Sequence, residues 1–431
     1  MRCCGVPKRT DPETYLRLAF ERTLLTQGSR NPMLEGFEGA VISRALTAAG
    51  ALEADAAQRV LEEYELAKAL RLPGPHRHML LHRSSLAQGQ RQRFSTERVA
   101  VCDVDFQHGN EQWVLDRVLF GQHSTRLDLS GSGPPGKRGN PRRHHVMGLA
   151  PAPHHPHPQT LTLADDQGTM ATADAGQASW SDVSWEARYT SDVALSPDTQ
   201  WIEVDGSRLE LPERQPGPEV RVEDIEPMDP LRATLYREIL STDRHQTGSD
   251  TVEIASKALV ATGALEEDDA LLSELRRIAD AVTSATPVPG LPEPWASLLT
   301  RYSKGDGTRG TVAIGAVIDD LEGFSIRLDS LASELGSFSI SFAISPGNPL
   351  LRHFPGMGGE PSPITWWAED DRMNAYVAFS DRGGGGADVA EGQVTSLAPL
   401  DPKATELRLL PTGTHSRAVV PVPLFGLAGA R

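Results

Sequence analysis

The chain has 431 residues and a formal net charge of −16 at pH 7, from 42 lysines and arginines against 58 aspartates and glutamates. That length exceeds one ordinary hydrophobic core and favours two or three domains. The acidic balance argues against general nucleic-acid binding, and the longest mostly apolar stretch, residues 419–430, is too short and proline-broken to span a membrane, so we expect no membrane partner.

The first ten residues, MRCCGVPKRT, contain no apolar core of a secretory signal. The chain has three cysteines, Cys3, Cys4 and Cys102, and the first two are adjacent at the chain end. This arrangement does not support a disulfide framework. We therefore expect a cytoplasmic protein.

Residues 1–72 are predicted to form a helical part of about three helices. The first helix is expected at about residues 12–26. An αα-hairpin follows, and its break is placed at Gly50, because glycine readily takes the left-handed conformation that ends a helix.

Residues 73–98 form a basic linker. Six arginines and three histidines lie between Arg71 and Arg98, against one acidic residue, Glu97. A solvated connector is the simplest interpretation. The alternatives are that the linker binds a protein partner, an acidic face of its own chain, or RNA, and this segment is the one exception to the expectation of no nucleic acid.

Residues 99–212 show the period-two alternation of β-strands, as in TRLDLS at 125–130, and predict a first β-sandwich. Cys102 lies inside the strand-like run VAVCDV, where a cysteine usually packs as a small buried apolar residue. No nucleophile elbow of the form GxSxG occurs in the chain, so nothing local indicates nucleophilic catalysis.

An inserted loop at residues 131–158 contains GSGPPGKR, which falls one residue short of the phosphate-binding pattern GxxxxGK[ST]. Lys137 would contact phosphate, but Arg138 occupies the position of the magnesium-binding hydroxyl. Gly139 and Pro141 oppose the helix that such a loop must precede. A loop between strands is favoured, and Lys137 and Arg138 stay candidate ligand-binding residues for a nucleotide-dependent alternative.

The same loop is rich in histidine, and His154, His155 and His157 are candidate metal ligands. Neutral imidazole binds Zn²⁺, Ni²⁺ or Cu²⁺. The surrounding prolines hold the tract extended, and neither CxxC nor HExxH accompanies it. Adventitious metal binding is the simpler interpretation, and no cofactor is expected.

The chain repeats itself. Residues 43–57, SRALTAAGALEADAA, match residues 256–270, SKALVATGALEEDDA, at ten of fifteen positions. The offset of 213 continues into the first strands and then falls to 205, so copy one carries the inserted loop. Repeats of this kind indicate a tandem duplication. Copy two is expected to comprise a linker at 213–227, a helical part at 228–300 and a β-sandwich at 309–425. Its first helix is expected at about residues 229–241, and its hairpin break at Gly263.

Acidic residues recur at matched turns of the two copies, as Asp165-Asp166 and as Glu369-Asp370-Asp371. Clustered carboxylates could bind Ca²⁺, but that cation requires 6 to 8 oxygen ligands. Aspartate in a tight turn also accepts hydrogen bonds from its own backbone. The turn-forming role is the favoured interpretation.

Trp366 and Trp367 are adjacent on a predicted strand, so their side chains point to opposite faces and one of them is a candidate exposed ligand-binding residue. Trp180, Trp185 and Trp201 lie at the corresponding end of copy one. An aromatic platform for a sugar or peptide is one interpretation. Packing in the core of a sandwich is the alternative that we favour.

The later half of each copy resembles the β-sandwich part of uncharacterised bacterial proteins that carry an acidic turn, a glycine-rich hairpin and a strand of the form PLxPxAxxLxL. The residues that carry the resemblance are ADDQGT (164–169) and ALSPDTQWIEV (194–204) in copy one, and AEDDRMNAY (368–376) and APLDPKATELRLL (398–410) in copy two. The resemblance implies a fold and no activity.

Together these patterns predict an α+β protein built by tandem duplication, each copy a helical part followed by an antiparallel immunoglobulin-like β-sandwich. The expected function is non-catalytic binding or scaffolding with a protein partner. The alternatives are a nucleotide-dependent protein that uses the loop at 131–138, and a carbohydrate or small-ligand module that uses exposed tryptophans.

Overall fold

A computed structural model describes most of the chain. The described residues are 9–26, 37–71, 90–94, 96–132, 158–180, 184–214, 217–241, 248–284, 288–302, 307–347, 364–385, 388–396, 398–425 and 427–429. The phosphate-loop residues Lys137 and Arg138 and the histidines of the inserted loop lie outside these ranges. Among the described residues, no helix is long and apolar enough to cross a membrane.

The helices occupy two stretches of the chain, one before each group of strands. They are α1 (Pro12–Thr26), α2 (Phe37–Ala48), α3 (Ala54–Arg71), α5 (Pro230–Ser241), α6 (Gly248–Thr262), α7 (Ala270–Ser284) and α8 (Trp295–Tyr302). The predicted first helix of each copy is confirmed as α1 and α5. Both begin with an aspartate–proline pair, in which Asp11 and Asp229 accept hydrogen bonds from the amides of Thr14 (2.9 Å) and Arg232 (2.8 Å).

The predicted hairpin breaks are also confirmed. Gly50 and Gly263 have φ values of +66° and +75°, which glycine adopts without a steric penalty. The residue after each glycine donates its amide hydrogen to a carbonyl five residues earlier, Ala51 to Leu46 (3.0 Å) and Ala264 to Leu259 (2.9 Å). Two helix ends 213 residues apart in sequence therefore close with the same hydrogen bonds.

The strands form two antiparallel sheets. The first sheet contains β1 (Thr96–His108), β2 (Glu111–Gly121), β3 (Thr125–Ser132), β4 (Thr160–Asp165), β5 (Met170–Trp180), β6 (Ser184–Ser191), β7 (Trp201–Val204) and β8 (Ser207–Glu210). The second contains β9 (Arg221–Asp224), β10 (Thr308–Leu321), β11 (Phe324–Ser333), β12 (Phe338–Ser345), β13 (Thr365–Asp370), β14 (Ala375–Gly385), β15 (Ala390–Ser396), β16 (Glu406–Thr412), β17 (Ser416–Pro423) and β18 (Ala428–Gly429).

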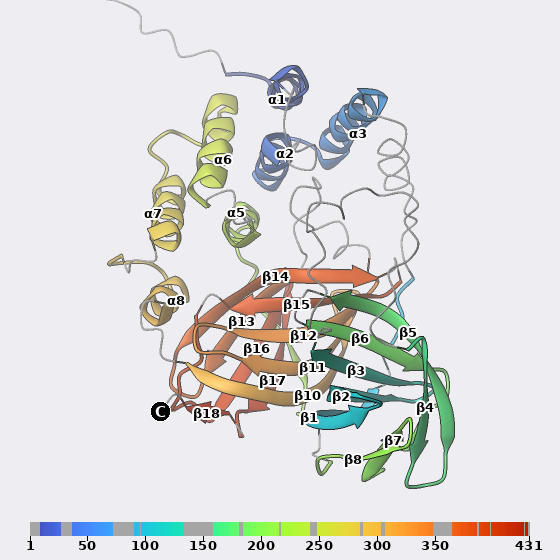
Figure 1. Cartoon of the computed structure of the whole chain (residues 1–431). Coiled ribbons are helices and arrows are strands. Elements are labelled where there is room, and N and C mark those ends of the chain that lie inside the picture. The colour runs from blue at the N-terminus through green and yellow to red at the C-terminus, as the bar shows by residue number, and fades with distance from the viewer. Residues whose placement is uncertain are drawn as a thin grey trace, which may run out of the picture.

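The two sheets share one strand order. The first runs β1-β2-β3-β6-β5-β4-β7-β8, and the second contains β10-β11-β12-β15-β14-β13-β16-β17 with β18 and β9 added at its edges. Each is strongly curled and nearly barrel-shaped, because its outer strands approach each other, β1 beside β8 and β10 beside β17 (Figure 1). This differs from the predicted sandwich of two facing sheets, since the strands of each half join into one continuous sheet.

Three elements add detail to the expected division of the chain. The segment 213–227, expected to be a linker, contains β9, whose residues pair with β17 at the edge of the second sheet. The basic linker also ends earlier than expected, because β1 begins at Thr96. The second helical part has four helices rather than three, since α8 follows α7.

The helices of both halves lie on one side of the second sheet (Figure 1), where α5 and α8 make the main contacts with β14 and the other helices pack mainly on one another. A single apolar core joins α1–α3 and α5–α8 to the second sheet, and includes Leu16, Leu46, Leu259 and Leu409. The first sheet has a separate core, with Trp113, Trp185 and Tyr189 at its centre. The molecule therefore consists of a large body, made of the helices and the second sheet, and a smaller first sheet attached to it.

Candidate functional site

The two adjacent tryptophans of β13 point to opposite faces of the second sheet. Trp366 is 4% exposed and packs in the core with its ring centroid 4.7 Å from that of Phe342. Trp367 is half-buried and faces the helices. Its ring meets that of the buried Trp295 of α8 edge to face, with the centroids 6.2 Å apart. The structure therefore assigns Trp366 to packing and leaves part of Trp367 accessible.

Trp367 lines a pocket of about 490 Å³ between the helical layer and the second sheet. The walls come from α2, α3 and α5, from the segment before α5, from the start of β13 and from the turn that follows β16. The pocket exists because the helices present small side chains to it, the alanines at positions 40, 48, 54, 57 and 233. Larger residues at these positions would fill the space.

The lining is mostly apolar. Tyr236, Leu61, Ile225 and Met228 join the alanines and Trp367 in forming the surface. Hydroxyl groups are contributed by Ser43, Thr47, Thr234, Thr365, Thr412 and Thr414. An apolar concavity of this size with a few polar groups is typical of small-molecule binding sites.

The charges beside the pocket are largely neutralised within the protein. Arg44 of α2 forms a bidentate ion pair with the buried Glu238 of α5, and one of its two contacts is 2.9 Å long. The hydroxyl of Tyr236 donates a hydrogen bond to Glu274 at 2.6 Å. Burial, together with this bond to Glu274, raises the pKa of Tyr236, so the phenol stays neutral at physiological pH. Glu226 completes the ionisable residues of the lining.

The acidic turns are structural. Asp165 accepts hydrogen bonds from the amides of Gln167 (3.1 Å), Thr169 (2.7 Å) and Ser196 (3.0 Å). Asp370 has the same role in the second sheet, where it also accepts the hydroxyl hydrogen of Tyr376 at 2.7 Å. The carboxylates are 3% and 0% exposed. Within the described ranges, no group of three or more histidine, cysteine or acidic residues is arranged to hold a metal ion.

Cys102 has the properties of a packing residue. It lies on β1, and burial raises the pKa of its thiol to about 12. The thiolate is the nucleophilic form of cysteine, and it is scarce at neutral pH when the pKa is so high. Cys102 packs against the apolar core of the first sheet.

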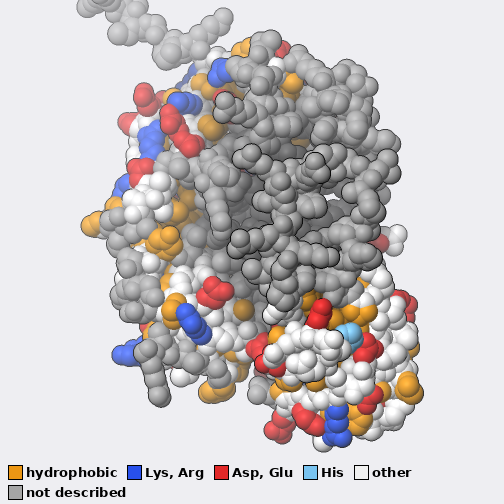
Figure 2. Space-filling model, viewed as in Figure 1, with side chains coloured by type: hydrophobic (Ala, Val, Ile, Leu, Met, Phe, Trp, Pro, Cys, Tyr) orange, Lys and Arg blue, Asp and Glu red, His pale blue; other side chains and the backbone are white. Residues whose placement is uncertain are grey.

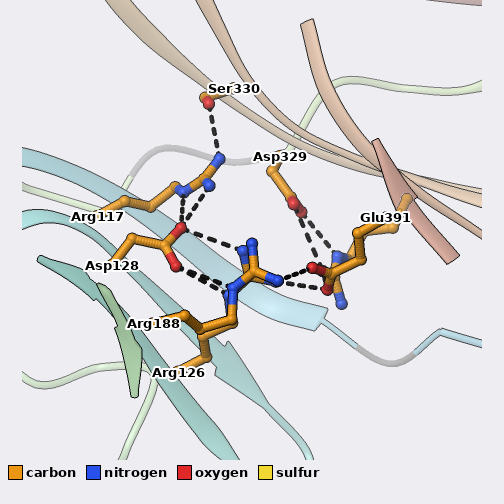
Figure 3. A network of polar contacts seen from close by, with 8 residues as sticks. Arg117, Arg126, Asp128, Arg188, Asp329, Ser330 and Glu391 are labelled. Atoms are coloured by element: carbon orange, nitrogen blue, oxygen red, sulfur yellow. Dashed lines mark hydrogen bonds and ion pairs between the residues drawn. The ribbon is translucent and has the colours of Figure 1, made fainter. Parts of the chain in front are cut away.

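A second cluster of polar residues lies where the two sheets meet (Figure 3). Asp128 of β3 is contacted by Arg117 at 2.8 Å and by Arg126 at 3.0 Å. Arg126 also reaches across to Glu391 of the second sheet at 2.5 Å, and Arg188 contacts the same carboxylate. Burial acts to raise the pKa of Asp128, but the arginines outweigh it and hold that pKa well below its usual range.

The basic linker contacts its own chain at residues 90–94. Arg91 forms an ion pair with Asp320 of β10 at 3.0 Å, and the amide of Gln92 donates to the hydroxyl of Ser345 at 2.6 Å. The guanidinium of Arg327 lies over the ring of Phe94, 5.2 Å from its centroid. Of the alternatives for this linker, the described part thus shows contact with an acidic residue of the same chain.

Neither the pocket nor the inter-sheet cluster has a direct signal in the amino-acid sequence. The pocket draws its walls from α2, α3, α5, β13 and β16, which meet only in the folded chain. The local sequence feature that relates to the pocket is the alanine-rich segment at 43–57, which is also the segment that repeats at 256–270. Of the inter-sheet arginines, Arg126 alternates with apolar residues along β3, in TRLDLS, a pattern that is also typical of the solvent-facing side of a strand. Arg117 and Arg188 lie on β2 and β6.

No protein-family model and no curated protein matches the chain. Among solved structures, the chain is similar to a conserved domain protein from Bacillus anthracis, over 75% of this chain and 80% of that one. The identity is 9% and the TM-score is 0.16. A likeness at this level carries no argument about fold or function.

Proposed function

We propose that the protein is a non-catalytic binding protein whose ligand is a small, uncharged and largely apolar molecule. The observation that supports this is the pocket of about 490 Å³ in which Trp367 is partly accessible. The apolar lining favours an apolar ligand, and the internal pairing of Arg44 with Glu238 leaves little net charge to attract an ion.

Binding in this pocket would involve both halves of the chain. Its walls include α2 and α3, which precede the first sheet, and α5, β13 and β16, which follow it. A ligand would therefore stabilise the contact between the helices and the second sheet, in proportion to its concentration above the dissociation constant. A protein partner, as expected from the sequence, would then bind to helices that the ligand has stabilised.

We also propose that the two halves arose by tandem duplication. The support comes from the shared strand order, from the matching helix ends at Gly50 and Gly263, and from the sequence offset. The side chain of Arg117 donates a hydrogen bond to Ser330, 213 residues later, at 2.9 Å. Residues at matched positions thus face each other where the sheets meet, as in a contact with approximate two-fold symmetry.

The test is the binding of Nile red, an uncharged apolar dye, measured by fluorescence titration. Ala233→Phe should fill part of the pocket, because Ala233 lines it from α5. We expect this variant to weaken dye binding at least ten-fold, while the anionic dye ANS binds poorly to the wild type.

The matched control is Ala261→Leu, which enlarges a half-buried alanine of α6 outside the pocket lining. Circular dichroism of both variants should match the wild type. Equal dye affinity in Ala233→Phe, Ala261→Leu and the wild type would place the dye elsewhere and remove the support for this pocket.

A further inference from the structure

The two sheets are joined by polar contacts rather than by a shared apolar core. β1 packs beside β10 and β11, but the buried apolar residues of the first sheet form a cluster separate from the one that unites the second sheet with the helices. A cavity of about 590 Å³ lies at this contact and is lined by residues of both sheets. Electrostatic interactions therefore contribute more than apolar burial to the stability of the contact between the sheets.

The arginines at this contact are already paired. Arg117, Arg126 and Arg188 of the first sheet engage Asp128 and Glu391 (Figure 3). Arg327 of the second sheet binds Asp329 at 2.7 Å and approaches Glu391 at 3.5 Å. These four arginines therefore pair with Asp128 of the first sheet and with Asp329 and Glu391 of the second.

Three further carboxylates line the cavity on the first sheet: Asp103 of β1, Asp116 of β2 and Glu186 of β6. Among the described residues, none of them forms an ion pair with an arginine or lysine. Asp116 is half-buried and accepts a hydrogen bond from Ser130 at 3.0 Å. Asp103 and Glu186 lie at the exposed rim.

The two sides of the cavity differ at matched positions. Asp329 and Glu391 lie 213 and 205 residues after Asp116 and Glu186. The later pair is neutralised by Arg327, Arg126 and Arg188, and the earlier pair is not. Of the two matched pairs of carboxylates, the earlier pair therefore has no ion-pair partner among the described residues.

We propose that the contact between the two sheets is a pH-sensitive joint, which is closed while Asp116 carries a proton and loosens when Asp116 ionises. Deprotonation places a negative charge beside Asp103, Asp128 and Glu186, in a partly desolvated cavity where the arginines among the described residues are already paired. Like charges repel, and the repulsion acts on Asp128, which shares Arg126 and Arg188 with Glu391 of the second sheet.

The pKa of Asp116 in the folded protein determines the direction of the pH dependence. Burial raises the pKa of Asp116 to about 7. The charges of Asp103, Asp128 and Glu186 act in the same direction, and the hydrogen bond from Ser130 opposes them. The folded state thus binds a proton that the unfolded chain releases near its ordinary value of 3.8. Stability from this group is present at low pH and is lost as pH rises towards and through 7.

Charged and neutral groups of both sheets line the cavity together with Asp116. On the first sheet they are Arg117, Arg126, Asp128 and Arg188, and on the second they are Asp329 and Glu391, with the neutral side chains of Thr311, Ser330, Ser341 and Gln393. The pKa of Asp128 is held low, so Asp128 stays charged through the neutral range. Burial also raises the pKa of Asp103 at the rim, whereas that of Asp116 is raised to about 7.

The experiment measures the separation of the two sheets. Spin labels are attached at Met170→Cys and Met373→Cys, because these side chains are 79% and 85% exposed and lie on the first and second sheets' hairpins. Cys3 and Cys4 are replaced by serine. Electron–electron distance distributions are then recorded at pH 5.5 and pH 8.5, together with thermal unfolding at both values.

We expect the distance distribution to broaden, and the melting temperature of the first sheet to fall by a few degrees, when pH rises to 8.5. Asp116→Asn keeps a neutral side chain at this position and should abolish both changes. The matched control Asp105→Asn alters an exposed residue of the neighbouring strand and should retain them. Identical distributions at both pH values in the wild type, or equal pH dependence in Asp116→Asn, would overturn the proposal.

Discussion

At the scale of single residues, this protein uses buried carboxylates to hold turns rather than to carry out chemistry. Asp165 accepts three backbone amide hydrogens from two different loops, and Asp370 does the same work in the second sheet. A carboxylate in this position replaces the water that the amides would otherwise bind. The same arrangement in both sheets fixes the hairpins between β4 and β5 and between β13 and β14.

Replacement of Asp165 tests this role. Asp165→Ala removes the shared, buried acceptor of the amides of Gln167, Thr169 and Ser196, which should reduce the free energy of unfolding by about 3 kcal/mol. Chemical denaturation measures the change. Asp174→Ala removes an exposed carboxylate that accepts the hydroxyl hydrogen of Thr160 on the neighbouring strand, and should change stability by less than about 0.5 kcal/mol. Equal effects in the two variants would show that the turn does not depend on its carboxylate.

The adjacent tryptophans show how far sequence reasoning reaches at this scale. Alternation along a strand is enough to separate the environments of Trp366 and Trp367. It does not tell which of the two becomes accessible, because that depends on where α5 and α8 pack. The side chain of Trp367 acquires its environment from segments that are distant in sequence.

At the scale of elements, the helix ends are the most predictable feature. A glycine in the left-handed conformation ends α2 and precedes α3, and its counterpart ends α6. Local conformational preference decides such a position, so a single sequence reveals it. The helix starts at Asp11 and Asp229 are governed by equally local hydrogen bonds.

Substitution at one helix end gives a direct measure of this preference. A Cβ atom added at Gly50 would meet no other atom within 4 Å, so Gly50→Ala tests the backbone conformation alone. We expect the variant to lose about 1 kcal/mol of stability, measured by thermal or chemical denaturation. Gly336 also has open space around it but no positive φ, and Gly336→Ala should be neutral or slightly stabilising. A neutral result for Gly50→Ala would contradict the assigned conformation.

The arrangement of the strands is less predictable from the sequence than the helix ends. The period-two pattern identifies most strands, but it does not indicate how the strands pair. A sandwich of two sheets and one continuous curled sheet have the same alternation of inward and outward residues. The difference lies in pairings such as β3 with β6 and β4 with β7, which join segments dozens of residues apart. β9 was missed because its four residues are all exposed and show no alternation.

At the scale of the whole molecule, the structure divides along its apolar cores and not along its sequence repeat. The helical parts of both halves belong with the second sheet, whereas the first sheet has a core of its own. On the face seen in Figure 2, acidic and basic side chains are interspersed over the helices, whereas the described part of the first sheet shows mainly acidic ones. A domain description based on the repeat alone would separate helices that pack together.

This division predicts how the protein unfolds. Segments that share a core should open as one unit, and segments with separate cores should open independently. In native-state hydrogen exchange with increasing denaturant, β2 and β3 should lose protection together, at a different denaturant concentration from β11 and α6. A higher salt concentration should shift the unfolding transition of β2 and β3, because salt screens the arginine–carboxylate contacts that join the sheets. A single common transition for all four segments would show that the two cores behave as one.

The contacts of residues 90–94 have a consequence for the order in which the protein can assemble during synthesis. Arg91 binds Asp320, which is translated 229 residues later. At the usual rates of translation, this interval is roughly ten to fifty seconds. The first sheet can complete its own core on the ribosome within that time, but it cannot dock, because the surface that receives it does not yet exist. A nascent chain of this protein therefore carries a folded but unattached first sheet, whose acidic and basic side chains at positions 116, 117, 126 and 188 stay hydrated until the second sheet emerges.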